Sequence, residues 1–148
     1  MNRNRAGFTV VELLIVMIIG SVLATIVSQS LGAYLERRAL DDSRAALIHM
    51  AARARSLGVD RGLALLDIDP AAETATLVQD GDTLAVVNLE TDYGTDLLAA
   101  SALSICYGPS GYALSSCTSF TANQTIGVRF RNATARLRVR PLGQIELP

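Results

Sequence analysis

The chain has 148 residues, which is enough for one globular domain beside an N-terminal anchor. Its 13 basic side chains, all arginine, and its 14 acidic side chains give a net charge of −1, which excludes a generally basic nucleic-acid-binding protein. With a single histidine and no group of residues at metal-ligand spacing, the sequence predicts neither a metal centre nor a cofactor.

The N-terminal third of the chain is predicted to form a membrane-spanning helix. A short basic leader, Met1 to Ala6, precedes Gly7, and an apolar run then extends from Phe8 to about Leu35. A helix over this run would be roughly 42 Å long, whereas a bilayer core needs only about 20 residues. The run also exceeds the roughly 7–15 apolar residues of an ordinary secretory signal, and no small-residue cleavage site of that type follows it.

Glu12 is the only charged residue in this apolar run. A carboxylate at the centre of a membrane-spanning helix costs about 2.5–3.5 kcal/mol on insertion scales, so such a residue is a candidate functional residue that needs a partner. The alternative is a signal anchor in which this glutamate has no role.

The segment from Gly7 to Leu14, GFTVVELL, resembles the class III leader junction of type IV pilins and type II secretion pseudopilins. The resemblance implies that a prepilin peptidase cuts the chain after Gly7 and then N-methylates Phe8. It also implies that Glu12 pairs with the terminal amine of a neighbouring subunit. Because an unpaired carboxylate and an unpaired ammonium are both costly in lipid, this pairing would set the register of subunits in a helical filament.

Beyond Leu35 the helix is predicted to continue as an amphipathic segment to Leu57, and Gly58 ends the pattern. Its apolar face consists of Leu40, Leu47, Met50, Ala54 and Leu57. This face is expected to complete the core of the domain that follows.

Short strands separated by turns are predicted from residue 63 onward, with polar loops at 88–96 and 115–124. The predicted strands are Leu63–Ile68, Thr74–Val78, Leu84–Leu89, Leu103–Tyr107, Tyr112–Leu114, Ile126–Arg131, Ala135–Pro141 and Gln144–Leu147. The predicted organisation is a prepilin leader at 1–7, a transmembrane or filament-core helix at 8–35, its periplasmic continuation at 36–57 and a β-rich globular domain at 58–148.

Two segments resemble the GspH/FimT subgroup of minor pilins and pseudopilins: Arg53 to Arg55, and Arg138 to Ile145, RVRPLGQI. The resemblance implies a β-sandwich in place of the single sheet of major pilins. The expected fold class is therefore α+β, with a long N-terminal transmembrane-plus-periplasmic helix packed on a C-terminal antiparallel, β-sandwich-like domain.

The two cysteines, Cys106 and Cys117, are predicted to form a disulfide if the domain lies in an oxidising compartment outside the inner membrane. Closing such a loop stabilises a domain by roughly 2–3 kcal/mol. Two free buried thiols are the main alternative. A metal pair is disfavoured because His49 is the only histidine.

The last predicted hairpin is rich in arginine. With a turn over residues 132–135, Arg131 is expected opposite Arg136, and Arg129 opposite Arg138. This register places Arg129, Arg131, Arg136, Arg138 and Arg140 on one face and Val128, Phe130, Leu137 and Val139 on the other.

Three interpretations of this arginine face remain open. It is a solvated face balanced by the protein's own acids, a contact with another subunit, or a DNA-binding surface, since phosphate contacts need clustered arginine. The acids considered as partners are Asp60, Asp67, Asp69, Asp80, Asp82, Asp92 and Asp96.

No catalytic constellation is evident, so the chain is not predicted to be an enzyme. The resemblance implies a structural minor pseudopilin of a type II secretion pseudopilus, which helps to initiate or cap the filament that exports folded proteins. Its partners would be the prepilin peptidase, other pilin or pseudopilin subunits and the inner-membrane assembly platform. It would be a single-pass inner-membrane protein with a periplasmic C-terminal domain, and part of a filament after assembly.

Two further functions are alternatives. One is a FimT-like minor pilin of a type IV pilus that binds DNA during uptake. The other is an uncleaved, single-pass periplasmic binding module, which an intact bond between Gly7 and Phe8 would favour.

Overall fold

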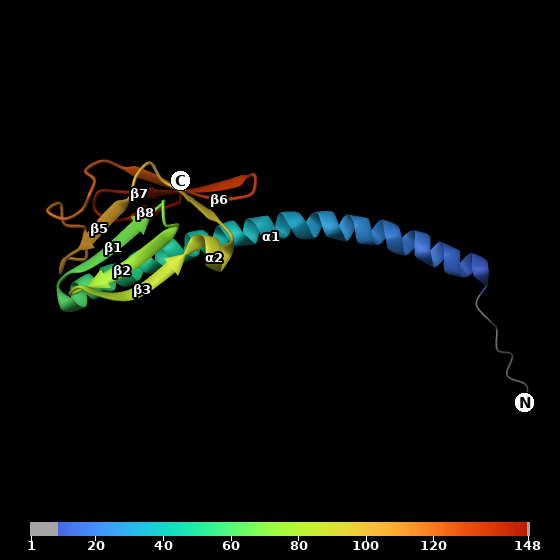
Figure 1. The fold of residues 1–148 in the computed structure, drawn as a ribbon, viewed down its shortest axis with the longest axis horizontal. Coiled ribbons are helices and arrows are strands. Elements are labelled where there is room, and N and C mark those ends of the chain that lie inside the picture. Colours follow the sequence, from blue (N-terminus) through green and yellow to red (C-terminus); the bar gives the residue numbers. More distant parts are fainter. Residues whose placement is uncertain (1–8, 148) are drawn as a thin grey trace, which may run out of the picture. The chain divides into compact units, whose positions relative to one another are not determined.

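The computed structural model describes residues 9–147 of the chain. The predicted leader and the predicted cleavage and methylation residues, Gly7 and Phe8, lie outside the described residues. A long helix, α1 (Val10–Arg61), is followed by two antiparallel sheets and one short helix (Figure 1). This confirms the predicted α+β class, with α1 ending at Arg61 instead of Leu57. The chain divides into two compact units, one up to Leu35 and one from Glu36 onward.

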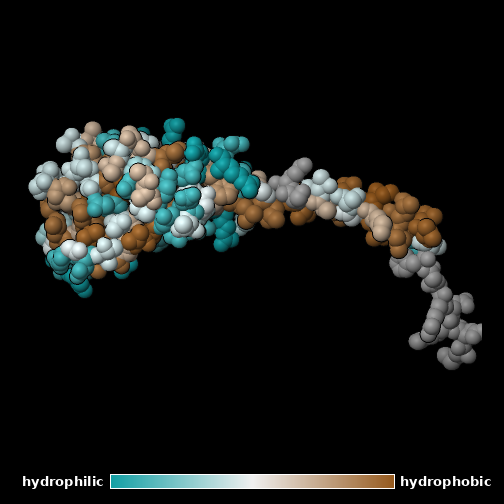
Figure 2. All heavy atoms as spheres, viewed as in Figure 1, coloured by the Kyte–Doolittle hydropathy of each residue, from teal (hydrophilic) through white to brown (hydrophobic). Residues whose placement is uncertain are grey.

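The part of α1 up to Leu35 is apolar on all sides. Seven consecutive large apolar side chains, from Leu13 to Ile19, are each at least half exposed, and together they point in every direction around the helix axis. Figure 2 shows the same apolar character along this segment. By length and composition α1 can cross a membrane. A helix that is hydrophobic all round requires a membrane or other helices to cover it.

The part of α1 from Glu36 onward is amphipathic, and its apolar face belongs to the core of the domain. Four residues of the predicted apolar face are buried and the last, Leu57, is half-buried. The buried residues of this part of α1 are Leu40, Ser43, Leu47, Met50, Ala51, Ala54 and Gly58. Ser43 is the polar exception: its hydroxyl lies 2.8 Å from that of Thr95, and both residues are fully buried.

Two four-stranded antiparallel sheets form the rest of the domain. The first has the order β3-β2-β1-β5, and the second has the order β4-β6-β7-β8. The strands of the first sheet are β1 (Ala64–Asp69), β2 (Thr74–Gln79), β3 (Asp82–Asn88) and β5 (Leu103–Tyr107). Those of the second sheet are β4 (Asp96–Leu98), β6 (Gln124–Phe130), β7 (Ala133–Val139) and β8 (Ile145–Glu146).

The core lies where α1 and one face of each sheet meet. Burial alternates along β1 and β2, as expected when one face of a sheet is covered. The largest fully buried apolar side chains come from both sheets and from the helices, and they include Leu47, Leu66, Leu77, Ile126 and Leu137. The domain therefore buries one face of each sheet.

Two predictions for the connecting segments are wrong. The region predicted as a loop at 88–96 contains the helix α2 (Leu89–Tyr93) and the start of β4. The side chain of Asn88 caps α2 by accepting the Thr91 amide at 2.9 Å, and Gly94 ends it with φ +68°. The predicted strand Tyr112–Leu114 is only a single bridge between Tyr107 and Ala113, because the Ala113 amide donates to the Leu142 carbonyl instead of to β5.

The structure joins Cys106 of β5 to Cys117 in a disulfide, with the two Cα atoms 5.7 Å apart. The segment that follows β5 folds back on this strand: the Leu114 amide donates to the Cys106 carbonyl at 2.8 Å, and the Ser119 amide donates to the Ser104 carbonyl at 2.9 Å. The disulfide therefore ties down a loop that is also held by backbone hydrogen bonds.

The predicted register of the last hairpin is wrong, although the faces are right. The turn is Arg131–Asn132, with Phe130 opposite Ala133, so Arg136 pairs with Gly127 instead of Arg131. Arg138 pairs with Thr125. In the predicted register arginines would lie directly opposite one another, which is destabilising. The observed register instead places Arg129, Arg136 and Arg138 opposite threonine or glycine on the other strand of the hairpin.

Candidate functional site

The start of α1 is a capping box formed by Thr9 and Glu12. The Glu12 amide donates to the Thr9 hydroxyl at 3.2 Å, while the Glu12 carboxylate accepts from the Thr9 amide at 3.5 Å and from its hydroxyl at 3.4 Å. This reciprocal arrangement satisfies two of the free amides at a helix N-terminus. This capping box was not predicted from the sequence, although the Thr-x-x-Glu spacing before an apolar run is its known signature.

The capping box gives Glu12 a local role in addition to the predicted role in assembly. Its carboxylate is exposed, and its hydrogen bonds to Thr9 are long, so it keeps the capacity to accept shorter bonds from another group. Both capping residues lie after the predicted cut at Gly7, so cleavage would leave this cap in place.

The arginines of the last hairpin lie on the exposed face of the second sheet, as predicted, except that Arg131 is in the turn with φ +53°. Val128, Leu137 and Val139 are buried on the opposite face, and Phe130 is half-buried. The alternation along β6 and β7 therefore separates the charged side chains from the core.

Three of these arginines have an acidic partner. Arg129 donates two hydrogen bonds to Asp96, at 2.9 and 2.7 Å, and Arg140 lies 2.9 Å from Glu146. Arg131 lies 3.9 Å from Glu36. Asp96 was among the predicted partners, whereas Glu36 and Glu146 were not. Each exposed pair of this kind contributes at most about 1 kcal/mol, so these pairs neutralise the face more than they stabilise the fold.

Arg136 and Arg138 differ from the other three. Neither has an acidic oxygen within 4 Å among residues 9–147. Arg138 is in register with Glu146 of β8, but that carboxylate is bound to Arg140. The charge of the arginine face is therefore concentrated on Arg136 and Arg138.

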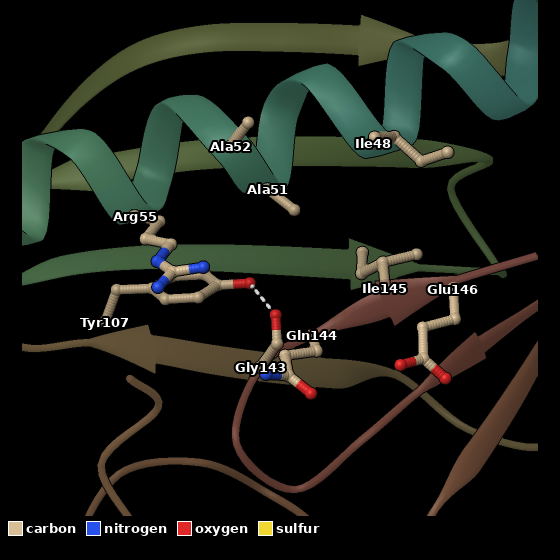
Figure 3. Close-up of a pocket in the computed structure, with 9 residues that line it drawn as sticks. All are labelled: Ile48, Ala51, Ala52, Arg55, Tyr107, Gly143, Gln144, Ile145 and Glu146. Atoms are coloured by element: carbon tan, nitrogen blue, oxygen red, sulfur yellow. Dashed lines mark hydrogen bonds between the residues drawn. The ribbon is translucent and has the colours of Figure 1, made fainter. Parts of the chain in front are cut away.

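An open cavity of about 380 Å³ lies between α1 and the C-terminal segment (Figure 3). The wall formed by α1 consists of Ile48, Ala51, Ala52 and Arg55, and the opposite wall consists of Tyr107, Gly143, Gln144, Ile145 and Glu146. The small side chains on α1 leave the space open. This cavity was not predicted from the sequence, because it depends on how two distant segments approach each other.

Tyr107 fixes one wall of the cavity. Its hydroxyl donates to the Gly143 carbonyl at 2.6 Å, as Figure 3 shows. Burial raises the pKa of Tyr107 to about 12, although the charge of Arg55 acts in the opposite direction. The hydroxyl therefore stays protonated at neutral pH and holds the C-terminal segment against β5.

No group of three or more potential metal ligands occurs among the residues that the structure describes.

The long helix and the antiparallel β-domain together give the chain a pilin-like α+β fold. Residues 2–28 match the family model of the prokaryotic N-terminal methylation motif. The fold is similar to that of the type IV minor pilin FimU of Pseudomonas aeruginosa, with a TM-score of 0.55 and 15% sequence identity. The similarity covers 78% of this chain and 92% of FimU. No curated protein sequence matches the chain.

Proposed function

We propose that this chain is a minor pseudopilin, a structural subunit that helps to initiate or cap a type II secretion pseudopilus. The observation that carries the proposal is that the part of α1 up to Leu35 is apolar on all sides and bears one carboxylate, Glu12, in its first turn, inside a matched methylation motif. Such a helix needs partners on every side, and other helices of the same kind supply them in a filament.

The proposed mechanism has two stages. Before assembly the helix anchors the chain in the inner membrane, with the β-domain in the periplasm, and a prepilin peptidase cuts after Gly7. The new amine at Phe8 is a cation in an apolar environment, so it is stabilised by the Glu12 carboxylate of a neighbouring subunit. On the assembly platform this pairing sets the axial stagger, and the apolar helices pack side by side. The role is structural, not enzymatic.

The arginine face supports a structural role over nucleic-acid binding. Arg129 and Arg140 are held by Asp96 and Glu146, and these acids would oppose the approach of a phosphate backbone. A surface that carries its own counter-charges is typical of a solvated face or of a contact with another protein.

A deletion strain tests this proposal against a role in a pilus. Removing the gene should abolish or strongly reduce secretion of folded proteins while surface pili remain, and the intact gene should restore secretion. Normal secretion with loss of pili would assign the chain to a type IV pilus instead. No effect on either process would favour the anchored periplasmic binding module.

A FimT-like, DNA-binding minor pilin is the second candidate. It is favoured by Arg136 and Arg138, which have no acidic partner in the described part of the chain. If it is correct, the chain in detergent binds double-stranded DNA, and affinity falls steeply with salt. Arg136→Gln with Arg138→Gln should then weaken binding by at least about tenfold, because each arginine that pairs with a phosphate supplies part of the electrostatic affinity. Arg129→Gln is the matched control, and no binding at low salt would exclude this candidate.

A further inference from the structure

The cavity between α1 and the C-terminal segment is bordered by a positive charge that the described residues do not balance. Arg55 has no acidic oxygen within 4 Å among these residues, and its guanidinium lies 5.6 Å from the centre of the Tyr112 ring. The other charged residue that lines the cavity, Glu146, is bound to Arg140 at 2.9 Å. An anionic group that entered the cavity would therefore find a positive partner in Arg55.

Apart from Tyr107 and Gln144, the rest of the lining is suited to an apolar group. Ala51, Ala52 and Ile48 form the helix side, and Ile145 lies opposite (Figure 3). The volume of about 380 Å³ falls within the range of roughly 300–1,000 Å³ found for ligand sites. A segment with a carboxylate next to an apolar side chain fits this combination of one guanidinium and apolar walls.

Three exposed apolar residues lie close to residues that line the cavity. Val59, Tyr112 and Leu142 are 51%, 45% and 54% exposed. Val59 and Arg55 both lie next to Gly111, because a Cβ added to that glycine would be 3.2 Å from both Arg55 Nε and Val59 Cγ2. Leu142 is held beside Ala113, whose amide donates to the Leu142 carbonyl at 3.1 Å. Apolar side chains grouped around a cavity indicate an interaction surface more strongly than the same residues scattered singly.

We propose that this cavity binds a carboxylate-bearing, partly apolar segment of another subunit of the same filament. The carboxylate pairs with Arg55, an adjacent apolar side chain enters between α1 and Ile145, and the rim residues Val59, Tyr112 and Leu142 cover the flanks of the segment. The pairing is charge-complementary, and a guanidinium can bind a carboxylate through two parallel hydrogen bonds. The identity of the partner as a filament subunit rests on the function proposed above.

The test uses the full chain, expressed in its host with the other filament subunits. A photo-cross-linking amino acid replaces Ala52, an exposed residue that lines the cavity. The expected product joins this chain to another subunit with a prepilin motif, at a peptide that contains Asp or Glu beside apolar residues. Arg55→Glu should reduce its yield by at least about tenfold, because like charges would then meet.

The matched control is Arg53→Glu, which changes the same charge on an exposed position of α1 that does not line the cavity. It should leave the yield unchanged. Replacing the partner's acidic residue with arginine should restore the cross-link of the Arg55→Glu chain, which a folding defect could not explain.

Three outcomes would overturn the inference. The first is a cross-link to a second copy of this chain. The second is a loss of cross-link yield with Arg53→Glu that equals the loss with Arg55→Glu. The third is the absence of any cross-link while the chain still enters the filament. The last result would leave the proposed function intact. If the chain never enters the filament, the proposed function itself fails, and this inference fails with it.

Discussion

Replacing Glu12 with alanine should leave the chain in the membrane but exclude it from the filament. The substitution makes the apolar helix more hydrophobic, so insertion is retained. It also removes the proposed partner of the amine at Phe8 in a neighbouring subunit. Losing one member of a buried ion pair costs about 3–5 kcal/mol, so incorporation should fall by well over tenfold. The measurement is the amount of this chain in sheared or purified filaments relative to the membrane fraction.

Two control variants separate this role from helix capping. Glu12→Gln keeps an acceptor for the Thr9 amide but has no charge, so we expect it to fail in assembly as Glu12→Ala does. Thr9→Val removes the hydroxyl that accepts the Glu12 amide and leaves the charge. If Glu12→Gln assembles normally while Thr9→Val does not, the glutamate acts as a helix cap and not as a charge partner.

Replacing Gly58 with alanine should destabilise the β-domain, although alanine normally favours a helix. A Cβ at this position would lie 2.6 Å from the Tyr107 carbonyl oxygen and 2.9 Å from its carbon, and these are backbone atoms that cannot move aside easily. Overpacking of this kind costs about 1–3 kcal/mol. The melting temperature should therefore fall by at least about 4 °C. Near-UV circular dichroism of the tyrosines in the full chain in detergent follows the transition.

The control for this prediction is Gly32→Ala, the same substitution on the same helix. Within the described residues nothing lies within 4 Å of a Cβ added there, so we expect no loss of stability in the domain. A Gly58→Ala chain that melts at or above the temperature of the original would show that α1 and β5 do not approach as closely as the structure has them.

The sequence was most informative where a local pattern is sufficient. The apolar run, its lone carboxylate and the helical spacing from Leu40 to Leu57 predicted α1 and most of its buried face. Strand β5 was predicted with its observed bounds, because a short apolar run there is followed by a clear turn signal. The other strands of the two sheets were predicted to within a few residues, except β4, which was not predicted, and the strand predicted at Tyr112–Leu114 is only a single bridge.

The last hairpin shows what a pattern cannot determine. The alternation of arginine and apolar residues set the faces, and those faces survive any slip by an even number of residues. Register depends on the turn, and the turn at Arg131–Asn132 is shorter than the one predicted over 132–135. A left-handed arginine in a turn gives little sequence signal, because this conformation favours glycine, asparagine and aspartate.

The features that the sequence analysis missed are of two kinds. The Thr9–Glu12 capping box and the Asn88 cap of α2 are local, and their spacing could have revealed them. The cavity beside Arg55 could not be found in this way. It depends on the approach of α1 to a segment near the C-terminus, and this segment is held against β5 by the hydrogen bond from Tyr107 to Gly143.

The intact mass of the chain after co-expression with a prepilin peptidase tests the central claim most directly. If the chain is a processed filament subunit, the mass should fall by that of Met1 to Gly7 and rise by one methyl group on Phe8. An active-site variant of the peptidase should leave the mass unchanged, and so should substitution of Gly7 by a bulky residue. An unprocessed chain beside a peptidase that cleaves another pilin in the same cells would contradict the assignment as a filament subunit.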